Sequence, residues 1–495
     1  MSSFRMRRLP LAMLAALPLS GSLVPPAFGQ SAPADSTART TSLQGVQVNA
    51  KIPRDSDSAT KTDTPIVAIP QSVSVITDEQ MARRGVQGIE EAVWYTAGAQ
   101  GGGYGPDSRS DWLLVRGFTP ARYLDGLALP EGTGTGITRI EPYGLERLEV
   151  IKGPSSVLYG AMPPGGMLNM ISKRPTEQPL HEVEVQVGSF DLRQGQFDFG
   201  GPLDDSGTLL YRLTGLARHS DTMADHIQDD RYYLAPALTW KPSGNTSLTV
   251  LARFQKGDTA SGAGFLPAAG TLLYNPNGKI PRNRFTGEPG QNDYDKTLAS
   301  VGYTFRHGFA NGISFSQNLR YGHSNVDSRG ANVGTFGLLA DDRTLVRYAF
   351  PNENHTHTFG VDNNLLYDFG TGALQHTVLV GLDYRRSHDD YASAFDFNAP
   401  TLDVFDPVYG SPVAVPAYTT HTVQVQKQLG VYAQDQIKIG RWGITVGGRQ
   451  DHVDTDTDQL IGGTHAHQRD RAFSGRVGTN YLFDSGFAPY VSWSH

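Results

Sequence analysis

Cysteine is absent from the 495 residues of this chain, so disulfide bonds cannot stabilise the fold and thiolate chemistry is excluded. Beyond the N-terminal segment, no stretch approaches the roughly 18 consecutive apolar residues that a transmembrane helix needs. This excludes a helical membrane protein and leaves a membrane-embedded β-barrel open. The formal net charge is −7 without a clustered basic face, which argues against a protein that binds nucleic acid.

The first 29 residues predict a secretory signal peptide. Three arginines in the first eight residues form a basic region, residues 9–23 are apolar, and Ala27-Phe28-Gly29 is a small-x-small cleavage site. We expect cleavage after Gly29. Residues 30–64 are rich in Ser, Thr and Asp and bury too little apolar surface to offset chain entropy, so we expect a flexible arm.

One short alternating patch lies inside this arm, with Leu43, Val46 and Val48 in LQGVQVNA. Such a segment can add as a β-strand to the sheet edge of another protein. On these residues alone, chance apolar residues in a tail explain the patch equally well.

The residue pattern of 65–175 predicts one small α+β domain. The alternation in QSVSVIT (71–77) predicts a strand, and Thr77-Asp78-Glu79-Gln80 predicts a capping box that opens a short helix. A second helix is expected between residues 89 and 98, with Gly98 as its stop. ERLEVIK (146–152) predicts a further strand.

The end of this domain, IKGPSSVLYGAMPPGGMLNMISKRP (151–175), is crowded with Gly and Pro. Its spacing fits neither a phosphate-binding loop nor the Gly-x-Ser-x-Gly turn of a hydrolase. It predicts instead a strand end, a single helical turn with Pro154 at its first position, and a Gly165-Gly166 turn into a last strand.

After Pro175 the apolar residues repeat with period two, as in EVEVQVG, where Val183, Val185 and Val187 share one face. We count about 13 such segments, joined alternately by short turns and by long polar loops such as 257–292 and 387–420. A soluble β-sandwich can alternate in the same way. Segments of about 10–15 residues, a persistently polar second face and aromatics near strand ends favour a transmembrane β-barrel.

Several long blocks occur together in one known family. These are TDTPIVAIPQSVSVIT (62–77), LLVRGF (113–118), EPYGLERLEVIKGPSSVLYGAMPPGGMLNMISKRP (141–175) and LPAAGTLLYNPNGKIPRNRFTGEP (266–289). The chain thereby resembles TonB-dependent outer-membrane siderophore receptors of the ferrichrome-receptor type, from about Lys61 onward. The alternating patch falls where this family carries its TonB box. Here that box is Gly45, Val46, Gln47, Val48, Asn49 and Ala50.

The resemblance implies an N-terminal α+β plug domain (65–175) in the lumen of an all-β transmembrane barrel, which has 22 strands in the family. Only about 13 strands fit into residues 176–495. Because an open sheet edge in lipid leaves backbone groups unpaired, we interpret this part as a partial transmembrane β-barrel and the chain as a C-terminally incomplete receptor.

The resemblance also implies a function in the bacterial outer membrane. TonB, with its inner-membrane energising complex, acts on the arm and drives uptake of a ferric siderophore. The protein would work as a monomer in outer-membrane lipid, without catalytic residues, a cofactor or nucleic acid. A receptor for haem, cobalamin or another metal complex stays open as an alternative, as does a non-transporting adhesin or phage-docking barrel.

The ligand is expected at the tips of two plug loops, 100–111 and 121–136. Aromatic side chains can pack on a ferric chelate and Arg suits an anionic one, whereas the alternative for each is a loop residue that packs on the barrel wall or is solvated. The candidates are Tyr104, Arg109, Arg122, Tyr123 and Glu131. Exposed aromatics of the long loops that complete this vestibule are expected to be Tyr274, Phe285, Tyr391, Phe395 and Phe397.

Two other motifs have a spacing known from metal sites. His355-x-His357 and His465-x-His467 each place two imidazoles on one strand face, but the sequence shows no third ligand. DTDTDQ (454–459) imitates the start of a calcium loop and lacks its Gly and closing Glu. We expect no metal site at these positions.

Overall fold

The computed structural model describes residues 55–495, apart from 106, 133–138, 262–264 and 329. The predicted signal peptide (1–29), most of the predicted arm and the TonB box residues Gly45 to Ala50 lie outside the described residues. All described residues belong to one compact unit, Ile52–His495. Within them, no helix has both the length and the apolar character needed to cross a bilayer.

The N-terminal part is built around a five-stranded sheet in the order β3-β8-β9-β6-β7. β6 runs parallel to β9, and the other neighbours are antiparallel. Two strand pairs, β1–β2 and β4–β5, and five short helices complete this part, which we call the plug. Its elements are β1 (Asp55–Ser56), β2 (Thr64–Pro65), η1 (Ile66–Ala68), β3 (Ser72–Thr77), α1 (Asp78–Arg83), α2 (Ile89–Ala92), β4 (Ala99–Gly101), β5 (Leu113–Val115), β6 (Ala121–Leu124), β7 (Leu127–Ala128), η2 (Pro142–Gly144), β8 (Leu145–Lys152), α3 (Ser156–Tyr159) and β9 (Gly166–Ser172).

Local signals set the plug's short helices. The predicted capping box is present, because the Thr77 hydroxyl accepts from the Gln80 amide and the Gln80 side chain accepts from the Thr77 amide. At α3 the prediction was wrong by two residues. The helix begins at Ser156 with Ser155 as its N-cap, so Pro154 precedes the helix and its carbonyl oxygen accepts from the Gln71 side chain.

The C-terminal part is a 13-stranded sheet in the order β10-β11-β12-β13-β14-β15-β16-β19-β20-β22-β23-β24-β25, antiparallel throughout. The predicted count of strands is therefore confirmed. The strands are β10 (Leu180–Val187), β11 (Arg193–Pro202), β12 (Leu209–His219), β13 (Asp229–Ser243), β14 (Thr246–Ala260), β15 (Asp293–Gly308), β16 (Ile313–Ser328), β19 (Asn352–Thr371), β20 (Leu374–Ser393), β22 (Thr420–Ile439), β23 (Trp442–Gln459), β24 (Thr464–Tyr481) and β25 (Tyr490–Ser494).

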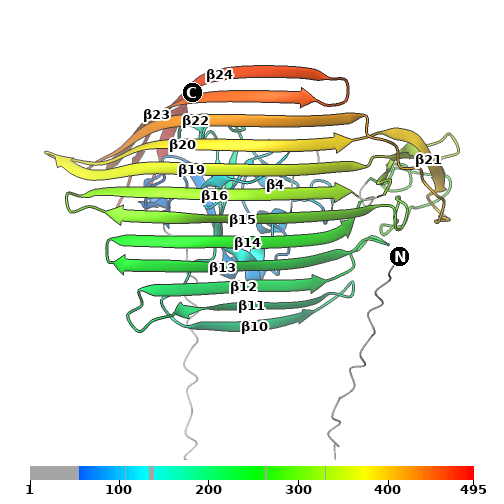
Figure 1. Cartoon of the computed structure of the whole chain (residues 1–495), viewed down its shortest axis with the longest axis horizontal. Coiled ribbons are helices and arrows are strands. Elements are labelled where there is room, and N and C mark those ends of the chain that lie inside the picture. Colours follow the sequence, from blue (N-terminus) through cyan, green and yellow to red (C-terminus); the bar gives the residue numbers. More distant parts are fainter. Residues whose placement is uncertain (1–54, 106, 133–138, 262–264, 329) are drawn as a thin grey trace, which may run out of the picture. The chain divides into compact units, whose positions relative to one another are not determined.

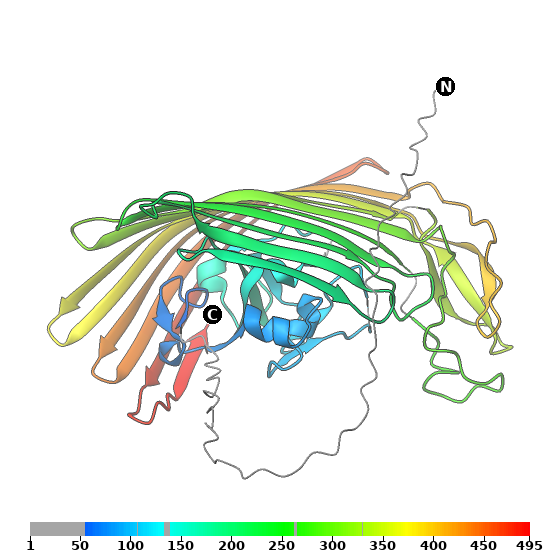
Figure 2. The same cartoon turned by 90° about the horizontal axis from the view of Figure 1, so that it is seen from below.

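Side chains alternate between the two faces of this sheet, as period two requires. On β13, Arg231 and Tyr233 are buried against the plug, whereas Leu234, Leu238 and Trp240 are exposed on the other face. Such an apolar outer face is what a lipid-facing barrel wall needs. Figure 1 shows the sheet face on, and Figure 2 shows that it is curved, with the plug elements on its concave side.

The two ends of the sheet differ in their connections. At one end the strands are joined by short turns, 244–245, 309–312, 372–373 and 440–441. At the other end β14 is followed by residues 261–292 before β15 begins. Barrels of the outer membrane have short periplasmic turns and long external loops, so the long-loop end is the external one.

About half of the predicted polar loop 387–420 is strand. β20 continues to Ser393, where it pairs with Thr420 at the start of β22. Part of the remaining segment joins a second, three-stranded sheet in the order β17-β18-β21 at the long-loop end. Its strands are β17 (Val333–Leu338), β18 (Thr344–Ala349) and β21 (Asp396–Asp403). The partners of β21 precede it by some fifty residues, and such a pairing leaves no local pattern.

One glycine of the wall makes room for a large lumenal side chain. Gly381 on β20 lies directly opposite Tyr432 on β22. A Cβ atom at Gly381 would lie 2.1 Å from the Cζ atom of Tyr432, far inside van der Waals contact. The Tyr432 ring therefore lies flat on the wall where the glycine leaves space, and it is 1% exposed.

Candidate functional site

An aromatic face lies at the long-loop end, on the loop 102–112 that joins β4 to β5. Tyr104 meets Trp112 edge to face at 5.0 Å between ring centroids, and Phe265 meets Tyr104 at 5.7 Å. Tyr104 and Phe265 remain 53% and 58% exposed. We call these three residues the aromatic face. Rings held in this way can pack on the organic surface of a ligand with little loss of side-chain entropy.

The barrel wall holds the loop that carries this face. The Ser108 hydroxyl contacts the Thr259 hydroxyl near the end of β14. Lys296, near the start of β15, donates from Nζ to the carbonyl oxygen of Ser108 at 2.7 Å. Since both strand ends belong to the long-loop end, the aromatic face is positioned by the wall as well as by the plug.

Arg109 does not present a free positive charge. Its Nε and Nη2 atoms donate to the two carboxylate oxygens of Asp107 at 3.0 and 2.8 Å, and Trp112 Nε1 donates to Asp107 Oδ2 at 2.8 Å. Burial opposes ionisation of Asp107, but the charge and hydrogen bonds of Arg109 outweigh it and hold the pKa of this carboxyl below its usual range. The pair therefore orients the Trp112 ring.

Arg122 and Glu131 form a second ion pair, deeper in the plug. The guanidinium of Arg122 is buried between the Glu131 carboxylate and Asp111, whose Oδ2 lies 3.6 Å from Arg122 Nη1. Burial raises the pKa of the Glu131 carboxyl, although Arg122 opposes the shift. Glu131 also lines a cavity of about 170 Å³ together with Arg385, Asp389 and other polar residues of β19, β20 and β22.

Tyr123 lies inside the plug and is 5% exposed. Its ring packs edge to face on Tyr159 at 5.1 Å, and its hydroxyl donates to the Tyr159 carbonyl oxygen at 3.2 Å. The five predicted ligand contacts thus fall in three places: Tyr104 and Arg109 at the aromatic face, Arg122 and Glu131 in the deeper ion pair, and Tyr123 below them. That they contact ligand stays a prediction.

Among the loop aromatics expected in the vestibule, Phe285 is not exposed. It is fully buried and contacts His226 and Tyr409 at 5.6 and 6.1 Å between ring centroids. By contrast, Phe395, directly before β21, and Phe397, on β21, are exposed and pack on each other at 4.8 Å, and Tyr274 is almost fully exposed. Tyr391 is half-buried on β20.

Sequence reasoning missed two residues of the aromatic face. Trp112 is the last residue before β5, which begins at Leu113, so a tryptophan at the end of the predicted plug loop was an available signal. Phe265 lies about 160 residues from Tyr104, and its place in the face follows only from how the long connection after β14 folds back.

Buried ion pairs join the plug to the wall. Arg231 of β13 is fully buried and donates to Glu141 Oε2 of the plug at 2.9 Å and to Asp229 Oδ1 of its own strand at 3.0 Å. Arg139 of the plug donates to Asp229 Oδ2 at 3.0 Å. The pairs link two plug residues to one strand of the wall.

Glu90 on α2 is buried, and its Oε2 atom has no hydrogen-bond partner within the described ranges. Burial and the neighbouring charge of Asp111 raise the pKa of Glu90 from 4.5 to about 8, against the opposing charge of Arg139. Between these two pH values the folded protein holds a proton that the unfolded chain releases. The free energy of unfolding therefore falls as the pH rises from about 4.5 to about 8 and then levels off.

We expect Glu90→Gln to stabilise the plug above pH 5, by several kcal/mol at pH 8 and above, because one pKa unit corresponds to about 1.4 kcal/mol. Near pH 4 the variant and the native protein should unfold alike. Calorimetry of the detergent-solubilised protein at both pH values measures this difference. Glu79→Gln, at an exposed position on α1, is the control, and a gain for Glu90→Gln that does not change with pH would contradict the assignment.

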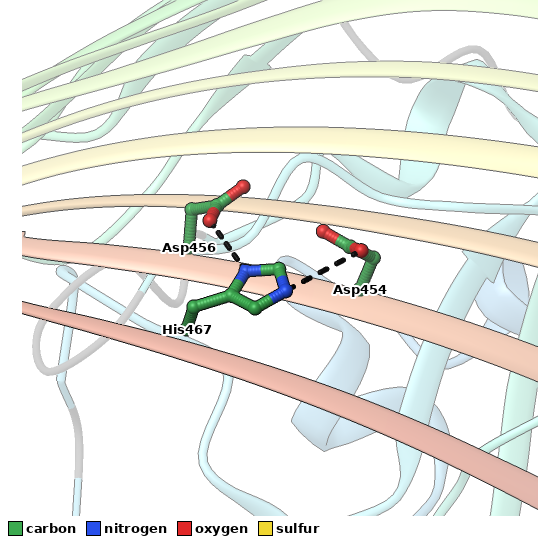
Figure 3. Close-up of side chains that lie close together, drawn as sticks. All are labelled: Asp454, Asp456 and His467. Atoms are coloured by element: carbon green, nitrogen blue, oxygen red, sulfur yellow. Dashed lines mark hydrogen bonds and ion pairs between the residues drawn. The ribbon is translucent and has the colours of Figure 1, made fainter.

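Two of the motifs with metal-like spacing, DTDTDQ (454–459) and His465-x-His467, prove to be neighbours across one hairpin. In the register of β23 and β24, Asp456 faces His467 and Asp458 faces His465. His467 Nδ1 lies 2.7 Å from Asp456 Oδ1, and its Nε2 lies 3.9 Å from Asp454 Oδ2, as Figure 3 shows. The possible ligand atoms of Asp454, Asp456 and His467 lie within 4.8 Å of one another. The register thus supplies the third ligand that the sequence did not reveal.

Ion pairs between the two strands explain why these side chains lie together. Arg469 Nε already lies 3.0 Å from Asp454 Oδ2, and His465 Nδ1 lies 2.7 Å from Asp458 Oδ1. Each of these side chains is at least partly exposed. Exposed cross-strand pairs of this kind contribute about 0.2–1 kcal/mol each to a hairpin.

A curved sheet with an outward apolar face and a plug ion-paired to its inner face defines a plugged outer-membrane barrel. Residues 65–167 match the family model for the TonB-dependent Receptor Plug Domain. Residues 239–495 match the model for the TonB dependent receptor-like β-barrel. The chain belongs to the TonB-dependent receptor family. The predicted resemblance, the location in the outer membrane and the role as a receptor and not an enzyme are confirmed by this membership.

Two similar relatives are named for siderophores. The ferrichrome outer membrane transporter/phage receptor of Escherichia coli K12 is 36% identical, over 98% of this chain and 69% of the relative. The ferrioxamine B receptor of Salmonella typhimurium SL1344 is 35% identical, over 88% of this chain and 62% of the relative. The chain thus spans about two thirds of the length of these relatives.

Solved structures agree on the fold. The closed form of the ferric-catecholate import receptor Fiu from Escherichia coli K12 superposes with a TM-score of 0.79 at 20% identity, over 89% of this chain and 67% of that one. The ferripyoverdine receptor of Pseudomonas aeruginosa superposes with a TM-score of 0.78 at 23% identity, over 89% of this chain and 58% of that one.

Proposed function

We propose that this protein is an energy-coupled outer-membrane receptor that takes up a ferric siderophore. The observation that carries the proposal is the aromatic face at the external end of a plug that is ion-paired to the barrel wall. Ligand bound there is separated from the periplasm by the plug, so uptake requires work on the plug. TonB would supply it through the N-terminal arm, and the apolar outer face suits a monomer in outer-membrane lipid. No resident cofactor is required.

The charges around the aromatic face narrow the class of ligand. Arg109 is neutralised by Asp107, and Arg122 is neutralised by Glu131 and Asp111. An anionic chelate at either guanidinium would meet a charge that a neighbouring carboxylate already neutralises, so its attraction there is weak. Contacts at this end are therefore dominated by aromatic side chains, and we infer a ferric chelate whose surface carries little net charge.

A receptor for a different metal complex is the second candidate. The metal-pseudopaline receptor CntO of Pseudomonas aeruginosa PAO1 is 30% identical over 86% of this chain and 60% of the relative. Haem and cobalamin are further candidate ligands of this kind, because both can present a large organic ring surface to an aromatic face. A non-transporting docking barrel is a weaker candidate, because it needs no plug.

Binding of a panel of complexes to the purified receptor tests the proposal, with tryptophan fluorescence as the readout because Trp112 belongs to the aromatic face. We expect uncharged ferric siderophores to bind more tightly than anionic ones. Tyr104→Ala should weaken that binding roughly tenfold, since an aromatic anchor of this kind contributes about 1–2 kcal/mol.

The matched control is Tyr95→Ala, which removes an exposed plug tyrosine that lies on Arg84 and not on the aromatic face. The Tyr95→Ala receptor should bind each complex as tightly as the native receptor does. Binding of haem or cobalamin in place of every ferric siderophore would overturn the assignment of the ligand.

A further inference from the structure

Three cavities follow one another between the plug and the wall, the first two along β19, β20 and β22 and the third along β13 to β16 and β19. The first, of about 170 Å³, is lined by Glu131, Asp389 and Gln424. The second, of about 40 Å³, is lined by Tyr123, Gly360 and Gln428. The third, of about 440 Å³, is lined by residues of the plug and of β13 to β19. We call this series the side passage.

Neighbouring cavities share lining residues, which fixes their order. Thr358 and Arg385 line both the first and the second cavity. Lys61, Gly126, Tyr159 and Asp362 line both the second and the third. The series is therefore continuous, and β19 is the strand that borders all three cavities.

The side passage runs from the external toward the periplasmic end. Asp389 and Gln424 of the first cavity lie near the residues where β20 ends and β22 begins, at the long-loop end. Lys241 and Ser247 of the third cavity flank the short turn between β13 and β14. The first cavity of the side passage is bordered by Glu131, a residue of the second apical loop of the plug.

The lining is polar at each stage, with hydroxyl, amide and charged groups such as Thr358, Arg385, Gln428 and Asn364. Such groups can exchange hydrogen bonds with an oxygen-rich chelate as it moves, without a deep apolar pocket that would hold it. This polar lining suits a ferric chelate whose surface carries little net charge, which is the class of ligand that we infer for the aromatic face.

One ion pair stands at the boundary between the second and third cavities. Lys61 Nζ lies 2.9 Å from Asp362 Oδ2 on β19, and both side chains are 9% exposed. The Tyr432 hydroxyl donates to Asp362 Oδ1 at 2.7 Å, and the Lys61 ammonium lies 4.2 Å from the centre of the Tyr432 ring. Tyr159 lies on the other side of the ammonium at 4.9 Å.

Lys61 belongs to the segment that connects the arm to the plug. Its neighbours Thr62 and Thr64 share hydrogen bonds with Gln436 of β22, and the Thr60 carbonyl oxygen accepts from Gln434 at 3.0 Å. Closer to the arm, Asp57 and Ser58 bind Arg147 and Asn169 of the plug itself. A pull on the arm therefore acts on these plug contacts and next on the contacts of residues 60–64 with the wall.

We propose that the ligand reaches the periplasm through the side passage, first along β19, β20 and β22 and then along β13 to β16, and that the Lys61–Asp362 ion pair closes this passage until the arm is pulled. The inference rests on the proposed function and adds to it the path along the wall and the closing contact. Because residue 61 lies eleven residues after Ala50, force on the arm reaches the ion pair once the contacts of Asp57 and Ser58 with β8 and β9 are released.

The test uses the absence of cysteine in the native chain. In the double variant Lys61→Cys/Asp362→Cys, a disulfide-containing bismaleimide joins residue 61 to the wall, and a reductant later cleaves the linker. Cross-linking should leave binding of an uncharged ferric siderophore to whole cells within about twofold, reduce its uptake at least tenfold, and allow uptake to recover on cleavage.

The matched control is Lys173→Cys/Asp198→Cys. Lys173 Nζ and Asp198 Oδ2 of β11 form a comparable ion pair of 2.8 Å, and neither residue lines any of the three cavities. Cross-linking there should leave uptake unchanged. Undiminished uptake with residues 61 and 362 joined would overturn the passage, as would equal loss of uptake for both cross-links.

Asp362→Asn gives a second measurement that does not depend on cross-linking, because Asn keeps the shape of the side chain and an acceptor for Tyr432. With the ion pair weakened, uptake under partial de-energisation by a protonophore should be several-fold higher than in the native receptor. Uptake by Asp362→Asn that is equal to or lower than uptake by the native receptor under these conditions would contradict the closing role. If the reduced double variant and the native receptor neither bind nor import any ferric siderophore, the proposed function itself is wrong, whereas import that ignores the cross-link overturns only the passage.

Discussion

Deletion of Leu43 to Ala50 is expected to reduce uptake of the ferric siderophore to the background of cells without the receptor, while binding to the cell surface stays within about twofold of the native level. The residues precede the described part of the chain, so the expectation rests on their alternating pattern and on the TonB box of the family. A strand that pairs with another protein transmits force through backbone hydrogen bonds, and without it the plug receives no work. The aromatic face contains none of these residues, so binding should persist.

The matched control deletes eight other residues of the arm, 34–41, which shortens it equally and removes no alternating patch. Uptake should then resemble that of the native receptor. Measurement of cell-associated and internalised radioactive iron separates binding from uptake. Unchanged uptake after deletion of 43–50, or loss in both deletions, would contradict energy coupling through this segment.

Substitution of Arg231 by Met is expected to lower the free energy of unfolding of the plug–wall contact by about 3–5 kcal/mol, the usual cost of removing one partner from a buried ion pair. Glu141 would lose its partner from the wall, and Asp229 would keep only the contacts from Arg139 and Arg218. Calorimetry should show the plug transition at a lower temperature, and the plug should become more sensitive to protease.

Two further variants distinguish a lost ion pair from a lost side chain. Arg193→Met removes an exposed pair with Asp191 and should change stability by less than about 1 kcal/mol. Arg231→Met/Glu141→Gln removes both charges and should recover part of the loss, since no uncompensated charge remains on Glu141. A loss for Arg231→Met no greater than that for Arg193→Met would mean that this pair does not hold the plug.

Elements with a local cause were predictable from the sequence. The Thr77–Gln80 capping box is contained in four consecutive residues, and it formed as expected. The wall strands follow from strict alternation, which places Arg231 and Leu234 on opposite faces of β13. These features depend on neighbours in the chain, and for that reason a single sequence reveals them.

Features that depend on register or on long-range pairing were not predictable. The partners Lys61 and Asp362 lie 301 positions apart, and no motif links them. Asp456 and His467 belong to two motifs that look incomplete until the register of β23 and β24 brings them together. The neutralisation of Arg109 by Asp107 is local in sequence, yet it depends on burial that turns the pair inward and that composition does not reveal.

Gly381 has a consequence for the Lys61–Asp362 ion pair. Because the position lacks a methyl group, the Tyr432 ring lies back against β20 and does not project into the side passage beside Asp362. A side chain at position 381 would displace this ring, and with it the hydroxyl that donates to Asp362. The Lys61–Asp362 contact thus depends on a glycine of the wall that touches neither of the two charged side chains.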